Sequence, residues 1–324
     1  FSADASSEYR KLKKTSFGVY AKGIPTNDFH YENLGAAAVR PYGGTESTYE
    51  DQSLASVMGS FSYSLLDRYT LSVNARGDGS SMVGDNNTWG FFPSVSFNWD
   101  LKKESFLANV KPLSMLKLRT GLGQAGNLGG ISAYTTMNTV RQTGIVPIKS
   151  SPTVTLGMRN NNPDLKWETK TTFNIGADLG FFANRLMLTA EYYYSKTSDM
   201  LYAYEVPVPP FAYNTLLANI GSMSNRGFEL GLSVQPISKK DMELNINMNL
   251  SFQSNKLISL GGNYKGMNMS AAPITAIGSL DGAGQNGGDN NVVYQIVGQP
   301  LGVFYLPHCK GLVKNENGSY FYDI

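Results

Sequence analysis

The stretch GLGQAG at residues 121–126 fits the GxGxxG pattern, in which glycines let a backbone turn approach the pyrophosphate of a nucleotide. The pattern also follows a predicted strand, as a dinucleotide site requires. However, the next residues, NLGG, are a poor start for a helix, and no Asp or Glu lies about 20 residues further on to bind a ribose. We therefore interpret these glycines as the end of a β-strand and predict no nucleotide cofactor.

Carboxylates and histidines are the other candidates for catalysis. Glu191 and Glu229 are candidates for a glycosidase-like carboxylate pair, but both fall on the polar side of predicted strands. His30 and His308 are the only histidines, they form no metal-spaced pair, and no GxSxG nucleophile elbow occurs. Cys309 is the only cysteine, which excludes an internal disulfide and a cysteine-rich zinc site. We predict no catalytic residue and expect the protein not to be an enzyme.

Acidic turns are candidates for calcium binding. Asp78, Asp85 and the stretch DGAGQNGGDNN at residues 281–291 offer oxygen ligands. The stretch fails the EF-hand pattern at its third position, which is Ala283. Because Asn, Asp and Gly also favour solvated turns, we predict no metal site and no cofactor.

The composition is unusual for a soluble protein. Only 16% of the 324 residues are charged, against about 25% in typical soluble domains, while 12% are aromatic. The formal net charge of +2 gives no broad basic surface, so we expect no nucleic-acid partner. No run of about 18 apolar residues is present, which excludes a transmembrane helix.

Strict alternation of apolar and polar residues suggests another class of protein. In LNINMNLSF, residues 244–252, the apolar residues take one side of an extended chain. The other side carries Asn245, Asn247, Asn249 and Ser251. A soluble sheet usually places Lys, Glu and Thr on its solvent face, so this small, uncharged row indicates a confined, wet space.

The alternation recurs along the chain. Seven more segments show it: 61–65, 69–76, 95–101, 116–123, 173–181, 186–195 and 228–234. With residues 244–252 they make about eight strands, near the roughly 9–11 residues that cross a bilayer at a tilt. The sequence therefore predicts an all-β fold.

The links between these segments alternate between short and long. Short links are predicted at 66–68, 182–184 and 238–241, and residues 102–115 belong to the same end with a brief amphipathic helix. Long polar loops are predicted at 77–89, 125–166, 201–219 and from 261 onward. Short turns at one end and long loops at the other are typical of an antiparallel, up-and-down transmembrane β-barrel.

Five ordered blocks carry a resemblance to a known family. They are RGDGSSMVGDNNTWGFFPSVSFNW (76–99), LKLRTGLGQAGN (116–127), NPDLKWETKTTFNIGADLGFFANRLMLTAEYYYSKTSDML (162–201), NIGSMSNRGFELGL (219–232) and VGQPLGVFY (297–305). With these blocks, the chain resembles the barrel region of SusC/RagA TonB-dependent outer-membrane transporters. The signature residues are Asp78, Gly79, Ser80, Trp89, Pro93, Asn162, Pro163, Trp167, Glu168, Asn225, Gly227 and Glu229.

The resemblance implies more than the residues themselves do. Residues 1–324 would form part of one barrel domain, with about eight or nine strands of a probable 22, short periplasmic turns and long extracellular loops. The plug domain, TonB box, signal peptide and final strands are expected to be absent from this chain. The implied function is TonB-dependent uptake of oligosaccharides or peptides across a Gram-negative outer membrane, with TonB and a SusD-like surface lipoprotein as partners. The asparagine row of residues 245–251 would then face the lumen, and the alternate apolar residues would face lipid.

Substrate contacts are predicted in the loop YAYEVPVPPFAYNTLL, residues 202–217. Aromatic rings beside polar groups are suited to sugars and peptides. The candidates are Tyr202, Tyr204, Glu205, Phe211 and Tyr213. The alternative is an ordered external loop, stiffened by its prolines, that packs on its neighbours.

Two other functions fit the strand pattern. A passive porin-like or adhesin barrel would share the pattern and would lack a plug. A soluble all-β carbohydrate-binding module would expose Asn245 and its neighbours to solvent and would need its own closed core.

Overall fold

The computed structural model describes the chain except for a few short segments. These are residues 27, 29, 31, 32, 40–44, 138, 139, 149, 150, 159, 280–290, 307, 309, 315, 316, 318, 319 and 324. Cys309 and residues 281–290 of the calcium candidate therefore lie outside the described residues. Within the described part, no helix is both long and apolar enough to cross a membrane.

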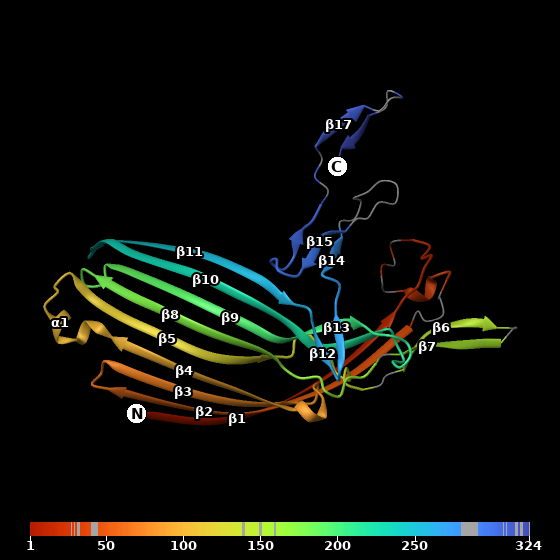
Figure 1. The fold of residues 1–324 in the computed structure, drawn as a ribbon, viewed down its shortest axis with the longest axis horizontal. Helices are drawn as coiled ribbons and strands as arrows, with labels where there is room; N and C mark the ends of the chain where they lie inside the picture. Colours follow the sequence, from red (N-terminus) through yellow and green to blue (C-terminus); the bar gives the residue numbers. More distant parts are fainter. Residues whose placement is uncertain are drawn as a thin grey trace.

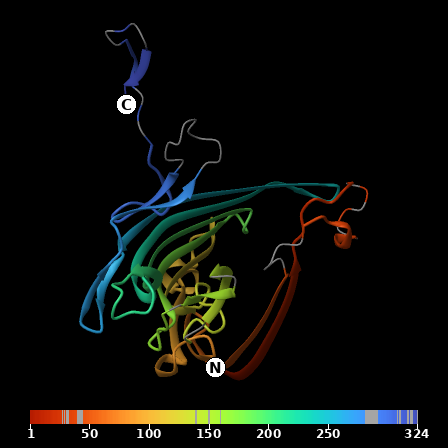
Figure 2. The same ribbon diagram turned by 90° about the vertical axis from the view of Figure 1, so that its right-hand side faces the viewer.

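Nine strands form one antiparallel sheet in the order β1-β2-β3-β4-β5-β8-β9-β10-β11. Their bounds are β1 (Ser2–Val19), β2 (Thr45–Leu65), β3 (Tyr69–Ser80), β4 (Trp89–Asp100), β5 (Leu113–Asn127), β8 (Glu168–Phe181), β9 (Leu186–Glu205), β10 (Thr215–Lys239) and β11 (Met242–Ser259). Each of these strands pairs with the next one in the chain, except that β5 pairs with β8. The two strands between them in sequence, β6 (Val140–Ile148) and β7 (Ser151–Met158), form a separate hairpin. Figures 1 and 2 show this sheet as a curved, open wall.

All eight predicted strands are present, which confirms the all-β, up-and-down arrangement. The ninth strand, β1, was not among them. Its sequence, SADASSEYRKLKKTSFGV, lacks the regular apolar spacing of the others. It is nevertheless paired with β2 over its whole length, from Ser2 opposite Ser62 to Val19 opposite Thr45. Backbone pairing with β2, rather than an amphipathic pattern of its own, defines this strand.

The short-turn end of the sheet matches the prediction. Leu66 and Asp67 both have positive φ, at 53° and 51°, and the Arg68 amide donates to the Leu65 carbonyl at 3.1 Å. Three residues therefore join β2 to β3, and two of them have the positive φ that is typical of tight hairpin turns. Between β4 and β5 lie a 3-10 turn, η4 (Leu101–Lys103), and the predicted brief helix, α1 (Ser105–Ala108).

Glu104 ties this end together. Its carboxylate accepts hydrogen bonds from the Tyr69 hydroxyl at 2.6 Å and the Trp99 indole at 3.0 Å, and it pairs with Arg68 at 2.8 Å. The hydrogen bond from Tyr69, followed by those from Trp99 and Arg68, lowers the pKa of Glu104. The carboxylate therefore stays ionised and links three elements at the turn end.

At the other end, the strands run further into the predicted loops than the sequence suggested. Strand β3 continues to Ser80, β5 to Asn127 and β9 to Glu205, while β10 already begins at Thr215. The expected loop boundaries at 77, 125, 201 and 219 were therefore wrong. Backbone pairing continues there, but packing on both faces removes the simple alternation that predicted the strands.

Short elements occupy the remaining segments at the long-loop end. They are η2 (Leu34–Ala36), η3 (Asp85–Asn87), the hairpin β12 (Gly261–Tyr264) and β13 (Met267–Ser270), the small sheet β14 (Ile274–Ser279), β15 (Asn291–Ile296) and β16 (Val303–Phe304), and the hairpin β17 (Gly311–Lys314) and β18 (Tyr320–Asp323). Figure 1 shows β14, β15 and β17 rising away from the large sheet.

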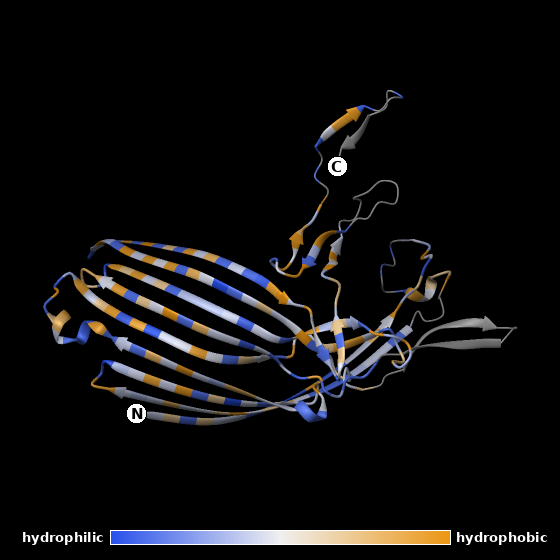
Figure 3. Ribbon diagram, viewed as in Figure 1, coloured by the Kyte–Doolittle hydropathy of each residue, from blue (hydrophilic) through white to orange (hydrophobic). Residues whose placement is uncertain are grey.

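The large sheet has one apolar and one polar face, because residues paired across strands share a face. One row of partners on the apolar face is Tyr63, Leu71, Phe97, Thr120, Ile175, Tyr192, Phe228 and Phe252. The row beside it on the polar face is Ser62, Ser72, Ser96, Gly121, Asn174, Tyr193, Gly227 and Gln253. Figure 3 shows the resulting alternation along the strands. The apolar face is open: Phe61, Phe97 and Phe228 are 47%, 37% and 41% exposed.

Candidate functional site

The polar face carries an ion network at mid-strand. Arg119 on β5 contacts Asp178 on β8 at 2.9 Å and Glu191 on β9 at 2.8 Å. Glu229 on β10 is the cross-strand partner of Glu191. Since Glu191 is held by a guanidinium, the two glutamates do not form the free acid and base pair that glycoside hydrolysis needs. The network supplies a hydrophilic lining.

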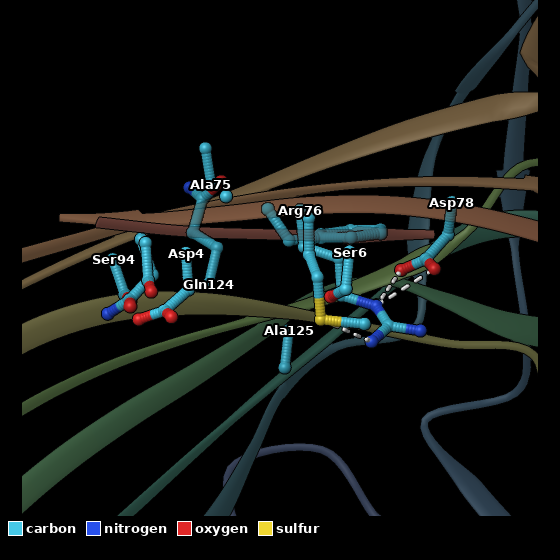
Figure 4. A pocket seen from close by; sticks show the side chains of 14 residues that line it. Asp4, Ser6, Ala75, Arg76, Asp78, Ser94, Gln124 and Ala125 are labelled. Carbon is cyan, nitrogen blue, oxygen red and sulfur yellow. Dashed lines mark hydrogen bonds and ion pairs between the residues drawn. The ribbon is translucent and has the colours of Figure 1, made fainter. Parts of the chain in front are cut away.

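A hollow of about 430 Å³ is lined by residues of β1 to β5. Figure 4 shows Arg76 in it, with its guanidinium directed at Asp78. The Arg76 Nε donates to both carboxylate oxygens of Asp78, at 2.8 and 2.9 Å, and its Nη2 donates to Ser56 at 3.0 Å. Asp4, Asn74, Ser94 and Gln124 line the rest of the hollow, together with the apolar side chains of Met58, Ala75 and Phe92. The hollow therefore offers both hydrogen bonds and apolar contacts.

Residues 160–167 form what we call the clasp segment, which links loops that are distant in sequence. Asn162 is 2% exposed, and its amide donates to the Leu217 carbonyl at 2.8 Å. Its side-chain oxygen accepts from the Asp164 amide and from the Tyr264 hydroxyl, both at 2.9 Å. One side chain therefore joins β10 and the β12–β13 hairpin to the clasp segment.

Hydrogen bonds from Asn219 and one ion pair also hold the clasp segment. Asn219 exchanges two hydrogen bonds with the backbone of Lys166, at 2.8 and 3.0 Å. Lys265, in the β12–β13 turn, contacts Asp164 at 2.7 Å. This hydrogen bond lowers the pKa of Asp164, and Asp164 raises the pKa of Lys265, so both stay charged near neutrality.

An apolar cluster packs around Trp167, the last residue of the clasp segment. Trp167 meets Phe92 edge-on, with ring centroids 5.5 Å apart, and both pack with Val83 and Ile131. Glycine is required around these rings, because a Cβ added to Gly126 would lie 2.2 Å from the Phe92 ring. The backbone also comes close elsewhere: a Cβ on Gly84 would lie 1.7 Å from the Pro163 carbonyl oxygen.

The candidates for nucleotide and metal binding take structural roles. The GxGxxG residues lie within β5 and are paired with β8, which confirms their interpretation as strand glycines. Asp78 is engaged by Arg76, and Asp85 begins the short turn η3. Among the described residues, no group of three His, Cys, Asp or Glu side chains could hold a metal ion.

Comparison with known proteins identifies the family. Residues 2–322 match the family described as TonB dependent receptor-like, beta-barrel. The chain belongs to this family. It is 36% identical over 213 residues to the TonB-dependent receptor SusC of Bacteroides thetaiotaomicron, which covers 65% of this chain and 21% of SusC. The predicted SusC/RagA resemblance is confirmed. The family and this relative are both named as TonB-dependent receptors, in agreement with the expectation that the chain is not an enzyme.

Other relatives agree. A TonB-dependent receptor of Formosa agariphila is 31% identical over 257 residues, which cover 78% of this chain and 25% of the relative. The structure of the RagAB peptide transporter superposes with a TM-score of 0.72 at 23% sequence identity, over 96% of this chain and 32% of that chain. At this identity the likeness concerns the fold. The chain spans about a fifth to a quarter of the curated relatives' length.

Most of the signature residues of this TonB-dependent receptor chain lie at the long-loop end. Two glycines lie under aromatic rings: a Cβ on Gly79 would meet Trp89 at 2.8 Å, and a Cβ on Gly227 would meet Tyr193 at 2.6 Å. Glu168 accepts hydrogen bonds from the Asn127 amide and the Leu201 backbone, both at 2.8 Å. Of the others, Asp78, Ser80, Asn162 and Trp167 are buried, Pro163 lies in the clasp segment, and Pro93, Asn225 and Glu229 lie within β4 and β10.

The five predicted substrate residues differ in how far they are buried. Tyr204 is 1% exposed and packs with Val206, Leu216 and Met269. Burial raises its pKa to about 12. Tyr202 and Phe211 pack on the edge of the same cluster, whereas Glu205 and Tyr213 are exposed.

The asparagine row of β11 shares the polar face with the ion network. Ser251 pairs with Glu229, Asn249 with Gly231 and Asn247 with Ser233. Glu229 in turn is opposite Glu191. Asn245 follows on the same side of the strand.

Proposed function

We propose that the protein to which this chain belongs is an outer-membrane importer. It takes up oligosaccharides or peptides with energy delivered through TonB, and a SusD-like surface lipoprotein works with it at the long-loop end. The curated relatives are TonB-dependent receptors, and the fold is similar to part of the RagAB peptide transporter. Residues 1–324 then form one wall of the barrel domain.

The observation that carries this proposal is the division of the sheet into two faces. On the apolar face, Phe61, Val73, Val95, Phe173 and Leu250 are between 41% and 47% exposed. Such a surface is stable against lipid and costly against water. A soluble carbohydrate-binding module would have to cover it with a second layer, and the sheet has none in the described part.

The opposite face suits a water-filled lumen. Its asparagine row, ion network and hollow offer hydrogen bonds to water and to a polar solute. Asn245, Asn247, Asn249 and Ser251 would line this lumen, as the sequence predicts. The loops at the clasp end would then face the cell exterior, because barrels of this kind keep their short turns in the periplasm.

Gene deletion tests the transport function. We expect a strain lacking the full-length gene to lose growth on some members of a panel of oligosaccharides and peptides supplied as sole carbon source, with growth on monosaccharides and amino acids unchanged. Loss of TonB should have the same effect, because the energy comes through it. If deletion of the transporter gene impairs growth but loss of TonB does not, the barrel is a passive porin. No growth defect on any member of the panel would favour an adhesin.

Substrate affinity tests the proposed external contacts. Glu205 and Tyr213 are the exposed candidates, so they are the ones available to a ligand. We expect Tyr213→Ala to weaken binding by about tenfold, because it removes a stacking ring. The measurement is calorimetry of the purified full-length transporter with a ligand from the growth screen. Tyr204→Phe is the matched control, since its buried ring stays in place. Equal affinity in all three proteins would favour the view that the loop only packs on its neighbours.

A further inference from the structure

The apolar face carries three basic side chains at its long-loop end. Lys196 of β9 and Lys256 of β11 both pair with Ser224 of β10, so the three residues form one row. Arg226 lies two residues along β10 on the same face. Because neighbouring strands are about 4.8 Å apart, the two lysine Cα atoms are about 10 Å apart, with Arg226 beside the gap. We call Lys196, Arg226 and Lys256 the basic triad.

The basic triad has no acidic partner. All three side chains are exposed, and none forms an ion pair within the described residues. On this face, the paired residues of β8 to β11 from the Leu188 row to the Lys196 row include no Asp or Glu. Arg119, on the opposite face, has two carboxylate partners. Uncompensated positive charge on one side of the sheet attracts an anion from outside the chain.

The basic triad also lies at a defined height. Tyr192, Tyr194, Phe228 and Phe252 are next to it toward the short-turn end, and they are 41%, 41%, 41% and 63% exposed. The apolar stretch of β9 from Leu186 to Tyr194 spans eight steps, or about 27 Å along the strand. At a barrel tilt of about 40° this is about 20 Å of height, slightly less than the ~25 Å apolar band of such barrels. The lysines therefore lie at the depth where lipid tails end and headgroups begin.

We propose that the basic triad binds the phosphate groups of an outer-leaflet glycolipid. This inference rests on the membrane location in the proposed function, which puts the long-loop end in the outer leaflet. A guanidinium takes a phosphate through two parallel hydrogen bonds, and the lysines add compact charge on either side. The aromatic residues next to the triad contact the boundary between headgroup and tails. Free phosphate would use only the cations, so the lipid is the better fit to the whole surface.

Lipid binding by the full-length transporter tests this inference. Diphosphoryl lipid A is the probe, titrated into detergent-solubilised protein and followed by native mass spectrometry. Each lost charge is expected to weaken binding by about fivefold, so the triple variant Lys196→Gln, Arg226→Gln, Lys256→Gln should bind about a hundredfold more weakly. The matched control is Lys111→Gln, Lys239→Gln, Lys240→Gln, which removes three exposed charges at the short-turn end and should bind normally.

Several outcomes distinguish a lipid from a soluble anion, and failure of this inference from failure of the proposed function. Lipid A without phosphates should bind weakly to the wild type, and equal binding would overturn the inference. Competition by millimolar inorganic phosphate would point to a soluble anion instead. Arg226→Gln alone, expected to weaken binding about fivefold, provides the test if the triple variant does not insert. A wild-type protein absent from the outer membrane would defeat the proposed function. Normal insertion with unchanged lipid binding in the triple variant would defeat only this inference.

Discussion

Arginine in place of Met248 is expected to destabilise the inserted barrel by about 2–4 kcal/mol, whereas arginine in place of Asn247 should change its stability little. Met248 is 48% exposed on the apolar face, opposite Leu232, midway along the apolar stretch of β11. A guanidinium there would have to enter the hydrocarbon region. Asn247 is opposite Ser233 on the polar face, where water can solvate the new charge.

Urea titration of the full-length protein in lipid vesicles measures this difference, with the folded fraction taken from heat-modifiable gel mobility. Met242→Arg is a useful control, because Met242 begins the same strand at the turn end. Near the interface the same substitution should cost only about 0–1 kcal/mol. Equal costs at positions 247 and 248 would contradict the proposed orientation, and equal costs at 242 and 248 would contradict the proposed depth.

The strands were predictable because one face of the sheet is apolar and the other is polar along most of its length. Leu244, Met248 and Phe252 are spaced for a surface that excludes water, and this spacing also set the register with β10. The same reasoning correctly put Glu191 and Glu229 together on the polar face. It failed for β1, whose residues carry no regular apolar spacing.

The long-loop end was less predictable, because its contacts join residues far apart in sequence. The family signature pointed to Asn162, but nothing nearby indicates Leu217 or Tyr264 as its partners, 55 and 102 residues away. Lys265 and Asn219 were not singled out as parts of a site for the same reason. Tyr204 had the aromatic, loop-like signature of a ligand contact, yet β9 extends through it and β13 covers its ring.

Asn162→Ala is expected to destabilise the long-loop end by about 2–4 kcal/mol. The substitution removes three hydrogen bonds at a site that is 2% exposed. It removes one hydrogen-bond partner each from the Leu217 carbonyl, the Asp164 amide and the Tyr264 hydroxyl. Since the β12–β13 hairpin depends on this side chain and on the exposed Lys265 ion pair, the hairpin should open first.

Hydrogen exchange of the full-length transporter in detergent measures that opening peptide by peptide. We expect faster exchange in β12, β13 and the start of β10, with β8 and β9 near the short turns unchanged. Asn86→Ala is the matched control, because its 3.3 Å hydrogen bond to Asp164 is exposed and its loss should change little. Uniformly faster exchange along all nine strands would mean that Asn162 stabilises the whole barrel. No change at β12 and β13 would mean that the apolar packing of Met269 and Tyr264 holds the hairpin without the clasp segment.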